Sequence, residues 1–293
     1  MKAAIVCLTK GYPDVRYYET LIRRNLHIYE NFNKNLNAQY PLLILHEGNI
    51  PDLHQKFILS NEKNNHVEFI NIQPDFLWPN AIDFSEVKDN RFHLGYRLMC
   101  RFHSSKIWKY VTNYDYILRI DEDVMMGPLN YNIFEYMDSN NLDYMPSRFM
   151  HEYHDLTNET LPKGISKYLD GLWKESDYDQ TVLWIPYTNL YAANVNFFKS
   201  NKVKAFLDNV TEDKNFLINR WGDAPMHGIC LKVFSEPSKV KTIHEFYCLH
   251  GSHHCITRNG RAIQGIMSEY EAKYFDCVPS GKGDMHYIAR NKT

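Results

Sequence analysis

Two carboxylates separated by one residue, Asp121 and Asp123, follow the apolar run from Tyr114 to Ile120. That run is typical of a buried strand, and in open α/β sheets ligands bind beyond the carboxyl ends of the strands. Side chains at positions i and i+2 of an extended segment lie on one face, so both carboxylates can converge on one hard divalent cation. Such a cation stabilises a diphosphate leaving group. The pattern therefore favours a metal site for a phosphorylated substrate, with a solvated or helix-capping acidic turn as the alternative.

Two further groups of residues could take part in chemistry. Asp223 lies in the segment Arg220-Trp-Gly-Asp-Ala-Pro-Met-His227, where an acid just before a helix can also act simply as a cap. A third group is rich in histidine and cysteine and comprises His244, Cys248, His250, His253, His254 and Cys255. Structural zinc sites usually contain paired Cys-x-x-Cys units, which this group lacks. A single histidine that joins the two aspartates on one cation is the simpler interpretation.

An Asp-x-Asp sequence after a strand also occurs in phosphatases of the haloacid dehalogenase type. In those enzymes the motif normally follows the first strand. Here it follows the fourth predicted strand and continues with Val124 and Met125. We therefore favour the cation site over a phosphatase nucleophile.

Hydrophobic periodicity predicts the elements that position these residues. Apolar runs typical of strands cover residues 2–8, 41–45, 67–72 and 114–120, and helical spacing covers 14–36 and 93–112. This alternation indicates a parallel sheet covered by helices. Further along the chain we expect a strand at 142–145, a helix at 165–173, a mixed stretch at 182–198, a helix after the turn at 222–225 and a strand at 240–247. Loops are expected at 73–90 and 155–163.

The composition excludes several classes of protein. The 293 residues are 44% hydrophobic and 23% charged, which is typical of a globular chain and not of a disordered one. A formal net charge of -2, from 33 basic and 35 acidic residues, argues against a nucleic-acid-binding protein. The six cysteines do not indicate a disulfide framework in a chain of this length, although one bridge among the last four remains open.

The start of the chain shows no targeting segment. The first apolar run, Ala3–Leu8, is far shorter than the roughly 20 residues of a membrane-spanning helix. A signal peptide would need a longer apolar stretch before a small-residue cleavage site. We therefore expect a soluble, cytoplasmic protein with no integral membrane segment.

Three segments of the chain resemble motifs of the fungal α-1,2-mannosyltransferases of glycosyltransferase family 15. That family shows Tyr-Arg-x-Met-Cys-Arg-Phe, Arg-Val-Glu-Pro-Asp-Val and Arg-Trp-Gly-Asp-Ala-Pro-Val-His. The chain carries similar residues in the same order at 96–104, 119–124 and 220–227, and the resemblance spans about Ala3 to Cys255. The protein is identified as a divergent soluble member of this family that lacks the membrane anchor, so the family's Golgi residence is not expected to transfer.

The resemblance implies a GT-A glycosyltransferase fold, with a Rossmann-like central mixed sheet flanked by helices. It implies a single domain over 1–293, with a nucleotide-sugar-binding half at 1–125, an acceptor-binding half at 126–255 and a C-terminal tail at 256–293. It also implies Mn²⁺ or Mg²⁺, a nucleotide-sugar donor such as GDP-mannose, a glycan or glycoprotein acceptor, and retention of configuration at the anomeric carbon.

The same resemblance assigns roles to individual residues by their place in the motifs. The metal ligands would be Asp121, Asp123 and His250. The donor-binding residues would be Lys10, Arg101 and Asp121. The catalytic residues would be Tyr96, Glu152, Tyr191 and Asp223.

Two departures from the family pattern bear on mechanism. Tyr191 stands where the family has a glutamate that has been proposed as the nucleophile, so no carboxylate need attack, and the acceptor hydroxyl could enter on the face that the diphosphate leaves. Gly251-Ser252 replaces Pro-Pro after the metal histidine, so His253 or His254 could substitute for His250.

Two alternatives to a GDP-mannose-dependent enzyme remain open. Nothing in the motifs identifies guanine or mannose, so the donor could be another nucleotide sugar, such as a UDP-sugar. The protein could also be a catalytically degenerate relative that binds carbohydrate, with Tyr191 as the sign of lost catalysis. The sequence leaves the acceptor, the linkage and the oligomeric state open.

Overall fold

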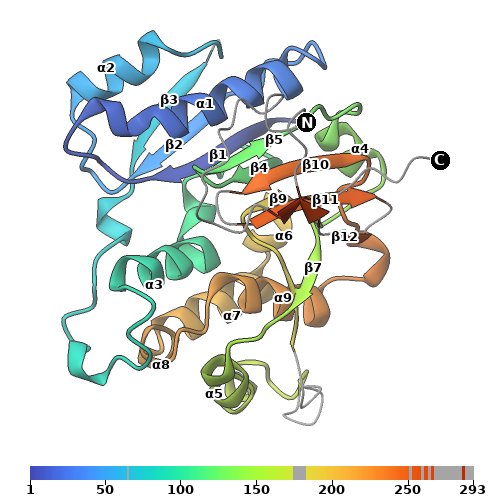
Figure 1. Cartoon of the computed structure of the whole chain (residues 1–293). Coiled ribbons are helices and arrows are strands. Elements are labelled where there is room, and N and C mark those ends of the chain that lie inside the picture. Colours follow the sequence, from blue (N-terminus) through green and yellow to red (C-terminus); the bar gives the residue numbers. More distant parts are fainter. Residues whose placement is uncertain are drawn as a thin grey trace.

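The structure is a computed structural model that describes residues 1–64, 66–173, 183–250, 253–258, 261–262, 265–266 and 286–287. Six strands form the central sheet in the order β3-β2-β1-β4-β9-β6 (Figure 1). The first four strands in this order are parallel, β9 is antiparallel to β4, and β6 is antiparallel to β9. The sheet is therefore mixed, as the resemblance implies. Its strands are β1 (Ala3–Thr9), β2 (Leu42–His46), β3 (Val67–Asn71), β4 (Tyr116–Ile120), β6 (Tyr144–Pro146) and β9 (Leu190–Asn194).

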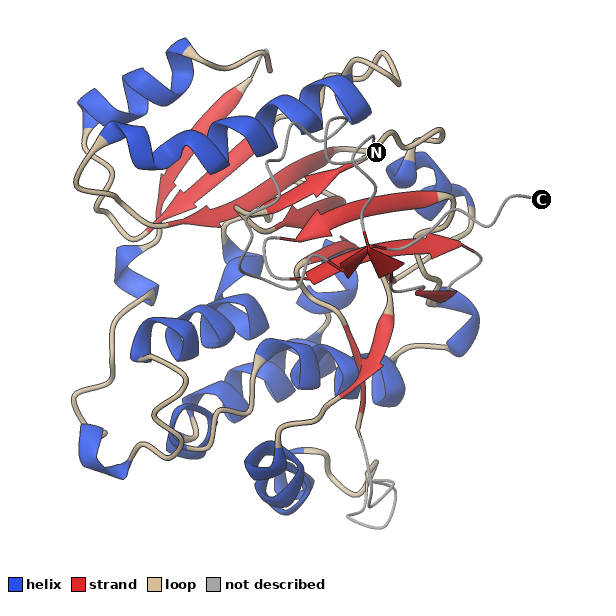
Figure 2. Cartoon of the chain, in the orientation of Figure 1, coloured by secondary structure: helices blue, strands red, loops and turns tan. Residues whose placement is uncertain are grey.

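Helices cover both faces of this sheet, as Figure 2 shows. Alternate residues of β1 enter opposite cores: Ala4 and Val6 lie in one, and Ile5 and Cys7 lie in the other. The Ile5 side is covered by α1 (Glu19–Ile28), α2 (Asp52–Ser60) and α4 (Ile133–Ser139). The Val6 side is covered by α3 (Leu94–Arg101), α5 (Asp155–Ile165), α6 (Val195–Lys199), α7 (Asn201–Glu212), α8 (Lys214–Ile218) and α9 (Asp223–Phe234).

Smaller sheets extend from the central one. A four-stranded sheet has the order β12-β11-β10-β5, in which β5 is Val124–Met126, β10 is Phe246–His250, β11 is His253–Arg258 and β12 is Arg261–Ala262. Two two-stranded sheets pair β7 (Phe149–His151) with β8 (Trp184–Pro186), and β13 (Gly265–Ile266) with β14 (His286–Tyr287). The antiparallel pairing of β5 with β10 brings residues near the end of the chain to the carboxyl end of β4.

Several predicted elements were wrong in type or position. The predicted loop at 155–163 is helix α5, and the helix predicted at 165–173 is absent beyond the 3-10 turn Ser166–Tyr168. Pro162 lies inside α5, and Gly164 permits a close approach, because a Cβ there would meet the Trp221 ring at 2.3 Å. Helix α7 was not predicted, and the strand expected at 240–247 is β10, which begins at Phe246.

The loop predicted at 73–90 is confirmed, with only the short 3-10 turns Gln73–Asp75 and Phe84–Glu86 in it. The buried Arg97 anchors the end of this loop and α8, because its guanidinium donates to the backbone carbonyls of Lys88, Asp89, Phe92, Leu217 and Ile218. No helix in the described part of the chain has the length and apolar content needed to cross a bilayer. The proposed division of the chain at 125 and 255 stays a prediction, and most of the tail at 256–293 lies outside the described residues.

Candidate active site

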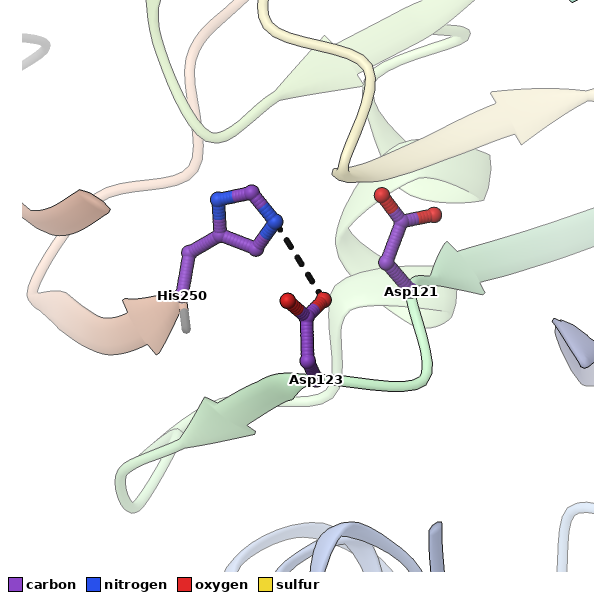
Figure 3. A group of neighbouring side chains, drawn as sticks. All are labelled: Asp121, Asp123 and His250. Carbon is purple, nitrogen blue, oxygen red and sulfur yellow. Dashed lines mark ion pairs between the residues drawn. The ribbon is translucent and has the colours of Figure 1, made fainter. Parts of the chain in front are cut away.

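Asp121, Asp123 and His250 form a cluster at the carboxyl end of β4. The two aspartates lie in the turn between β4 and β5, and His250 is the last residue of β10, where the strand register places it opposite Val124. One ligand atom from each of the three side chains lies within 4.8 Å of the others (Figure 3), and His250 Nε2 is 3.2 Å from Asp123 Oδ1. Two carboxylates and an imidazole fit a divalent cation such as Mn²⁺.

Arg119 connects the group of Asp121, Asp123 and His250, hereafter the cation cluster, to α9. Its buried guanidinium lies 2.6 Å from Asp121 Oδ1 and 3.2 Å from Asp223 Oδ2, and it also donates to the backbone carbonyl of Thr188. Burial acts to lower the pKa of Arg119, but the two carboxylates outweigh it, and the pKa is raised. Burial also raises the pKa of Asp121 to about 6, against the opposing charge of Arg119. The arginine therefore stays protonated and fixes both acids.

Within the cation cluster, His250 favours the charged form of Asp123. Burial alone would raise the pKa of this carboxyl, but the hydrogen bond and charge of His250 outweigh it, and the pKa falls below its ordinary value. The Asp123 side chain is therefore an anion that could bind a cation. Glu122, between the two aspartates, points away from the cluster and accepts hydrogen bonds from Thr9 and Tyr12.

Asp223 is the first residue of α9 and not its cap, because Gly222 occupies the capping position with φ 75°. That φ lies in the left-handed region, which glycine adopts without strain. Arg220 in the same turn also has a positive φ, 55°. This tight turn directs both Arg220 and Asp223 into one cavity, so the capping interpretation of Asp223 is not supported.

Arg220 joins two of the predicted catalytic residues. Its Nη2 donates to the Tyr96 hydroxyl at 2.9 Å, and its Nη1 lies 3.3 Å from Glu152 Oε2. The guanidinium also lies over the Phe92 ring, 4.4 Å from its centroid. Burial raises the pKa of Tyr96 strongly, so this side chain remains a neutral phenol. The arrangement joins α3, the β7–α5 connection and the turn before α9 into one wall.

These walls enclose a cavity of about 230 Å³. Five of the predicted site residues line it: Tyr96, Asp121, Glu152, Asp223 and His250. Asp123 faces His250 at its edge. Further lining residues include Arg119, Tyr187, Asn189 and Arg220, to which the sequence analysis gave no role. Both arginines lie inside the motifs of the resemblance, at 119–124 and 220–227, which was the available signal. Tyr187 and Asn189 lie outside these three motifs, so the sequence offered no signal for them.

The structure does not bring three predicted residues to this cavity. Lys10 is exposed after β1, with its ammonium 5.2 Å from the centroid of the Tyr12 ring. Arg101 pairs with Glu212 at 2.8 Å on the α3–α7 surface. Tyr191 is fully buried. The alternative metal ligands His253 and His254 have side chains outside the described part of the structure.

The Tyr191 ring occupies the interior of the molecule behind the cavity. It stacks on Tyr144 with centroids 4.8 Å apart, and the Arg119 guanidinium lies 5.8 Å from its centroid. With an exposed fraction of 0%, the phenol has no route to a substrate in this conformation. Nucleophilic attack by Tyr191 therefore has no geometric support.

Tyr187 contacts His250 on the ring nitrogen that does not face Asp123. Its hydroxyl lies 3.1 Å from His250 Nδ1, and the Arg148 guanidinium lies over its ring, 4.3 Å from the centroid. A histidine that binds a cation through Nε2 carries its proton on Nδ1, and a partner at Nδ1 fixes this tautomer and the ring orientation. Tyr187 is thus placed to orient His250 toward the aspartates.

We expect Tyr187→Phe to weaken Mn²⁺ binding by about 10-fold, the lower end of the range for loss of such an outer partner. The ring and its contact with Arg148 remain, so the thermal midpoint should change little. Titration of free Mn²⁺ by electron paramagnetic resonance measures the affinity. Tyr131→Phe is the control, because that hydroxyl accepts from the His244 backbone outside the cluster. Equal Mn²⁺ affinity in Tyr187→Phe and the wild type would contradict the assignment.

Comparison with known families gives one match over most of the chain. The family described as "Glycolipid 2-alpha-mannosyltransferase" matches residues 1–264. Among similar proteins, the probable mannosyltransferase KTR3 of Saccharomyces cerevisiae is 28% identical over 60% of this chain and 49% of its own length. Glycolipid 2-alpha-mannosyltransferase 1 of Candida albicans is 30% identical over 50% of this chain and 37% of its own. The matches to these relatives thus cover about half of their length or less.

Two solved structures share the fold. The mannosyltransferase Ktr4p from S. cerevisiae in complex with GDP has a TM-score of 0.71 at 22% identity, over 88% of this chain and 73% of that one. Core-mannan synthase A from Aspergillus fumigatus, in an Mn/GDP form, has a TM-score of 0.70 at 19% identity, over 99% and 81%. The likeness confirms the expected GT-A fold.

Proposed function

The chain belongs to the glycolipid 2-alpha-mannosyltransferase family, and from this premise we propose that it is a metal-dependent retaining glycosyltransferase. The proposed donor is a nucleotide sugar, with GDP-mannose as the first candidate, and the acceptor is a hydroxyl of a glycan or glycoprotein. The observation that carries the proposal is the single cavity in which Asp121 and His250 of the cation cluster face Glu152 and Asp223.

The cation cluster marks the donor end of this cavity. Asp121, Asp123 and His250 would hold Mn²⁺, which when bound neutralises the charge of the donor diphosphate. Arg119 orients Asp121 and carries a fixed positive charge at the same end. GDP and Mn are named for the structures of Ktr4p and core-mannan synthase A, which supports a guanosine diphosphate sugar and this cation.

The other two acids of the cavity, Glu152 and Asp223, would serve the acceptor. Glu152 is buried beside Arg220, and Asp223 is buried beside Arg119, so both carboxylates have fixed directions. Either can accept a hydrogen bond from the acceptor hydroxyl and orient it for attack. Because Tyr191 is buried and no carboxylate stands in its place, we favour attack from the face that the diphosphate leaves, which retains the anomeric configuration.

The buried Tyr191 is also the observation that favours a second candidate, a carbohydrate-binding protein that has lost catalysis. Against it, two aspartates, a histidine, Glu152 and Asp223 all remain grouped around the cavity. Relatives that lose catalysis usually lose part of such a set. We therefore place the active transferase first.

A melting-curve screen with nucleotides and sugars separates these functions. GDP, GDP-mannose, UDP and a UDP-sugar would each be tested with and without Mn²⁺, and a free mannose oligosaccharide would be tested alone. A ligand at 100 times its Kd adds about 2.7 kcal/mol of stability. We expect Mn²⁺-dependent stabilisation by the guanosine compounds. Stabilisation by uridine compounds instead would change the donor, and stabilisation by the oligosaccharide alone would favour the binding protein.

A further inference from the structure

Asn189 lies in the cavity wall immediately before β9. Its backbone carbonyl accepts from the Asp121 amide at 2.9 Å, so its main chain is fixed to the end of β4. The residue is 5% exposed and lines the same cavity as Asp121 and Asp223. The backbone of Asn189 is therefore fixed beside Asp121 in the cavity wall.

The Asn189 carboxamide is buried without a partner. Neither Oδ1 nor Nδ2 has a hydrogen-bond partner within the described ranges of the chain. Its neighbours are engaged, because the Thr188 carbonyl accepts from Arg119 and the Tyr187 hydroxyl contacts His250. A carboxamide supplies two N–H donors and one acceptor oxygen, and buried groups of this kind are nearly always satisfied in native proteins. The unpaired amide points to a polar ligand in the cavity.

The Asn189 side chain reaches the cavity from the turn that precedes β9. Tyr191 packs inside against Tyr144, whereas Asn189 reaches the cavity. A donor whose diphosphate lies at Asp121 places its sugar in this cavity, which Asn189 lines together with Asp121 and Asp223.

We propose that the Asn189 carboxamide binds hydroxyls of the transferred sugar. One hydroxyl donates to Oδ1, and a neighbouring hydroxyl accepts from Nδ2, which satisfies both ends of the amide with one ligand. A nucleoside diphosphate lacks the transferred sugar, and in the proposed site its ribose lies beyond the diphosphate, so it leaves the amide untouched. The proposal rests on the proposed function, since it assigns a contact in that same site.

The test compares two ligands that differ only by the sugar. GDP and GDP-mannose are titrated calorimetrically in Mn²⁺ against the wild type and Asn189→Ala. We expect the Kd of GDP to stay within about twofold and the Kd of GDP-mannose to rise by about 10-fold, as for loss of two hydrogen bonds of ordinary strength. If the alanine variant does not fold, Asn189→Ser is titrated in its place, with the same selective loss expected.

Asn33→Ala is the matched control. Asn33 is likewise 5% exposed and has a buried, unpartnered Oδ1, but it ends the π-helical turn Tyr29–Asn33 that follows α1 and does not line the cavity. The Asn33→Ala substitution should change neither the Kd of GDP nor that of GDP-mannose. An unchanged Kd for GDP-mannose in Asn189→Ala, or equal losses for both ligands, would overturn the sugar contact. A wild type that binds neither ligand would overturn the proposed function, and this inference with it.

Discussion

Asp123→Ala is expected to lose sugar transfer and donor hydrolysis by at least about 100-fold in kcat while the protein stays folded. The loss follows from removal of one of three ligands in the cation cluster. Stability should change little, because the Asp123 side chain is 47% exposed and its ion pair with His250 lies at the surface of the site. The thermal midpoint should fall by less than about 4 °C. Release of GDP from GDP-mannose and a melting curve measure the two effects.

Glu122→Gln is the matched control for this variant. Glu122 is the middle acid of the same turn, but its carboxylate accepts from Thr9 and Tyr12 outside the cation cluster. Glutamine keeps an acceptor oxygen for one of these bonds, so Mn²⁺ affinity should stay within about twofold, well short of the 10-fold or greater loss typical when a partner that orients a metal ligand is removed. Wild-type turnover in Asp123→Ala would refute the metal assignment.

Arg119→Met is expected to destabilise the protein by about 3 kcal/mol and to abolish transfer. Methionine fills similar space, but it removes the guanidinium that pairs with both Asp121 and Asp223 and leaves these carboxylates unpaired in a buried site. For a protein of this size the midpoint should fall by about 6–12 °C. Urea unfolding followed by fluorescence gives the free energy of unfolding.

The double variant Arg119→Met/Asp223→Asn separates charge from packing. With one of the two carboxylates neutralised, part of the lost stability should return, although transfer should not. Stability equal to wild type in Arg119→Met alone would show that the arginine does not hold these acids in solution.

The first half of the fold could be predicted because its strands are buried on both faces. β1, β2 and β4 are nearly continuous apolar runs, which periodicity identifies without tertiary information. The later strands β5, β6, β7 and β8 have three residues each, too few to show a period. Helix α5 was missed because Pro162 and Gly164 oppose helix formation locally, whereas contact with Trp221 favours it in the folded protein.

In the candidate site, too, some residues could be predicted from the local sequence and others only from contacts in the folded protein. Asp121 and Asp123 followed from a local pattern, but His250 followed only from the family resemblance, since the pairing of β5 with β10 joins segments far apart in the sequence. Asn189 was missed because its proposed role rests on a side-chain amide without hydrogen-bond partners among the described residues. Only the structure shows this. Arg101 lies inside a family motif, yet in the structure its guanidinium is engaged by Glu212.

The pairing of β5 with β10 also constrains the order of events during synthesis. The aspartates emerge from the ribosome long before His250, and that histidine joins them only after β10 has docked on β5. The three side chains of the cluster therefore cannot come together before β10 has been synthesised and has paired with β5. If the proposed function is right, capture of the ion would come late in folding and would report that β10 has paired with β5.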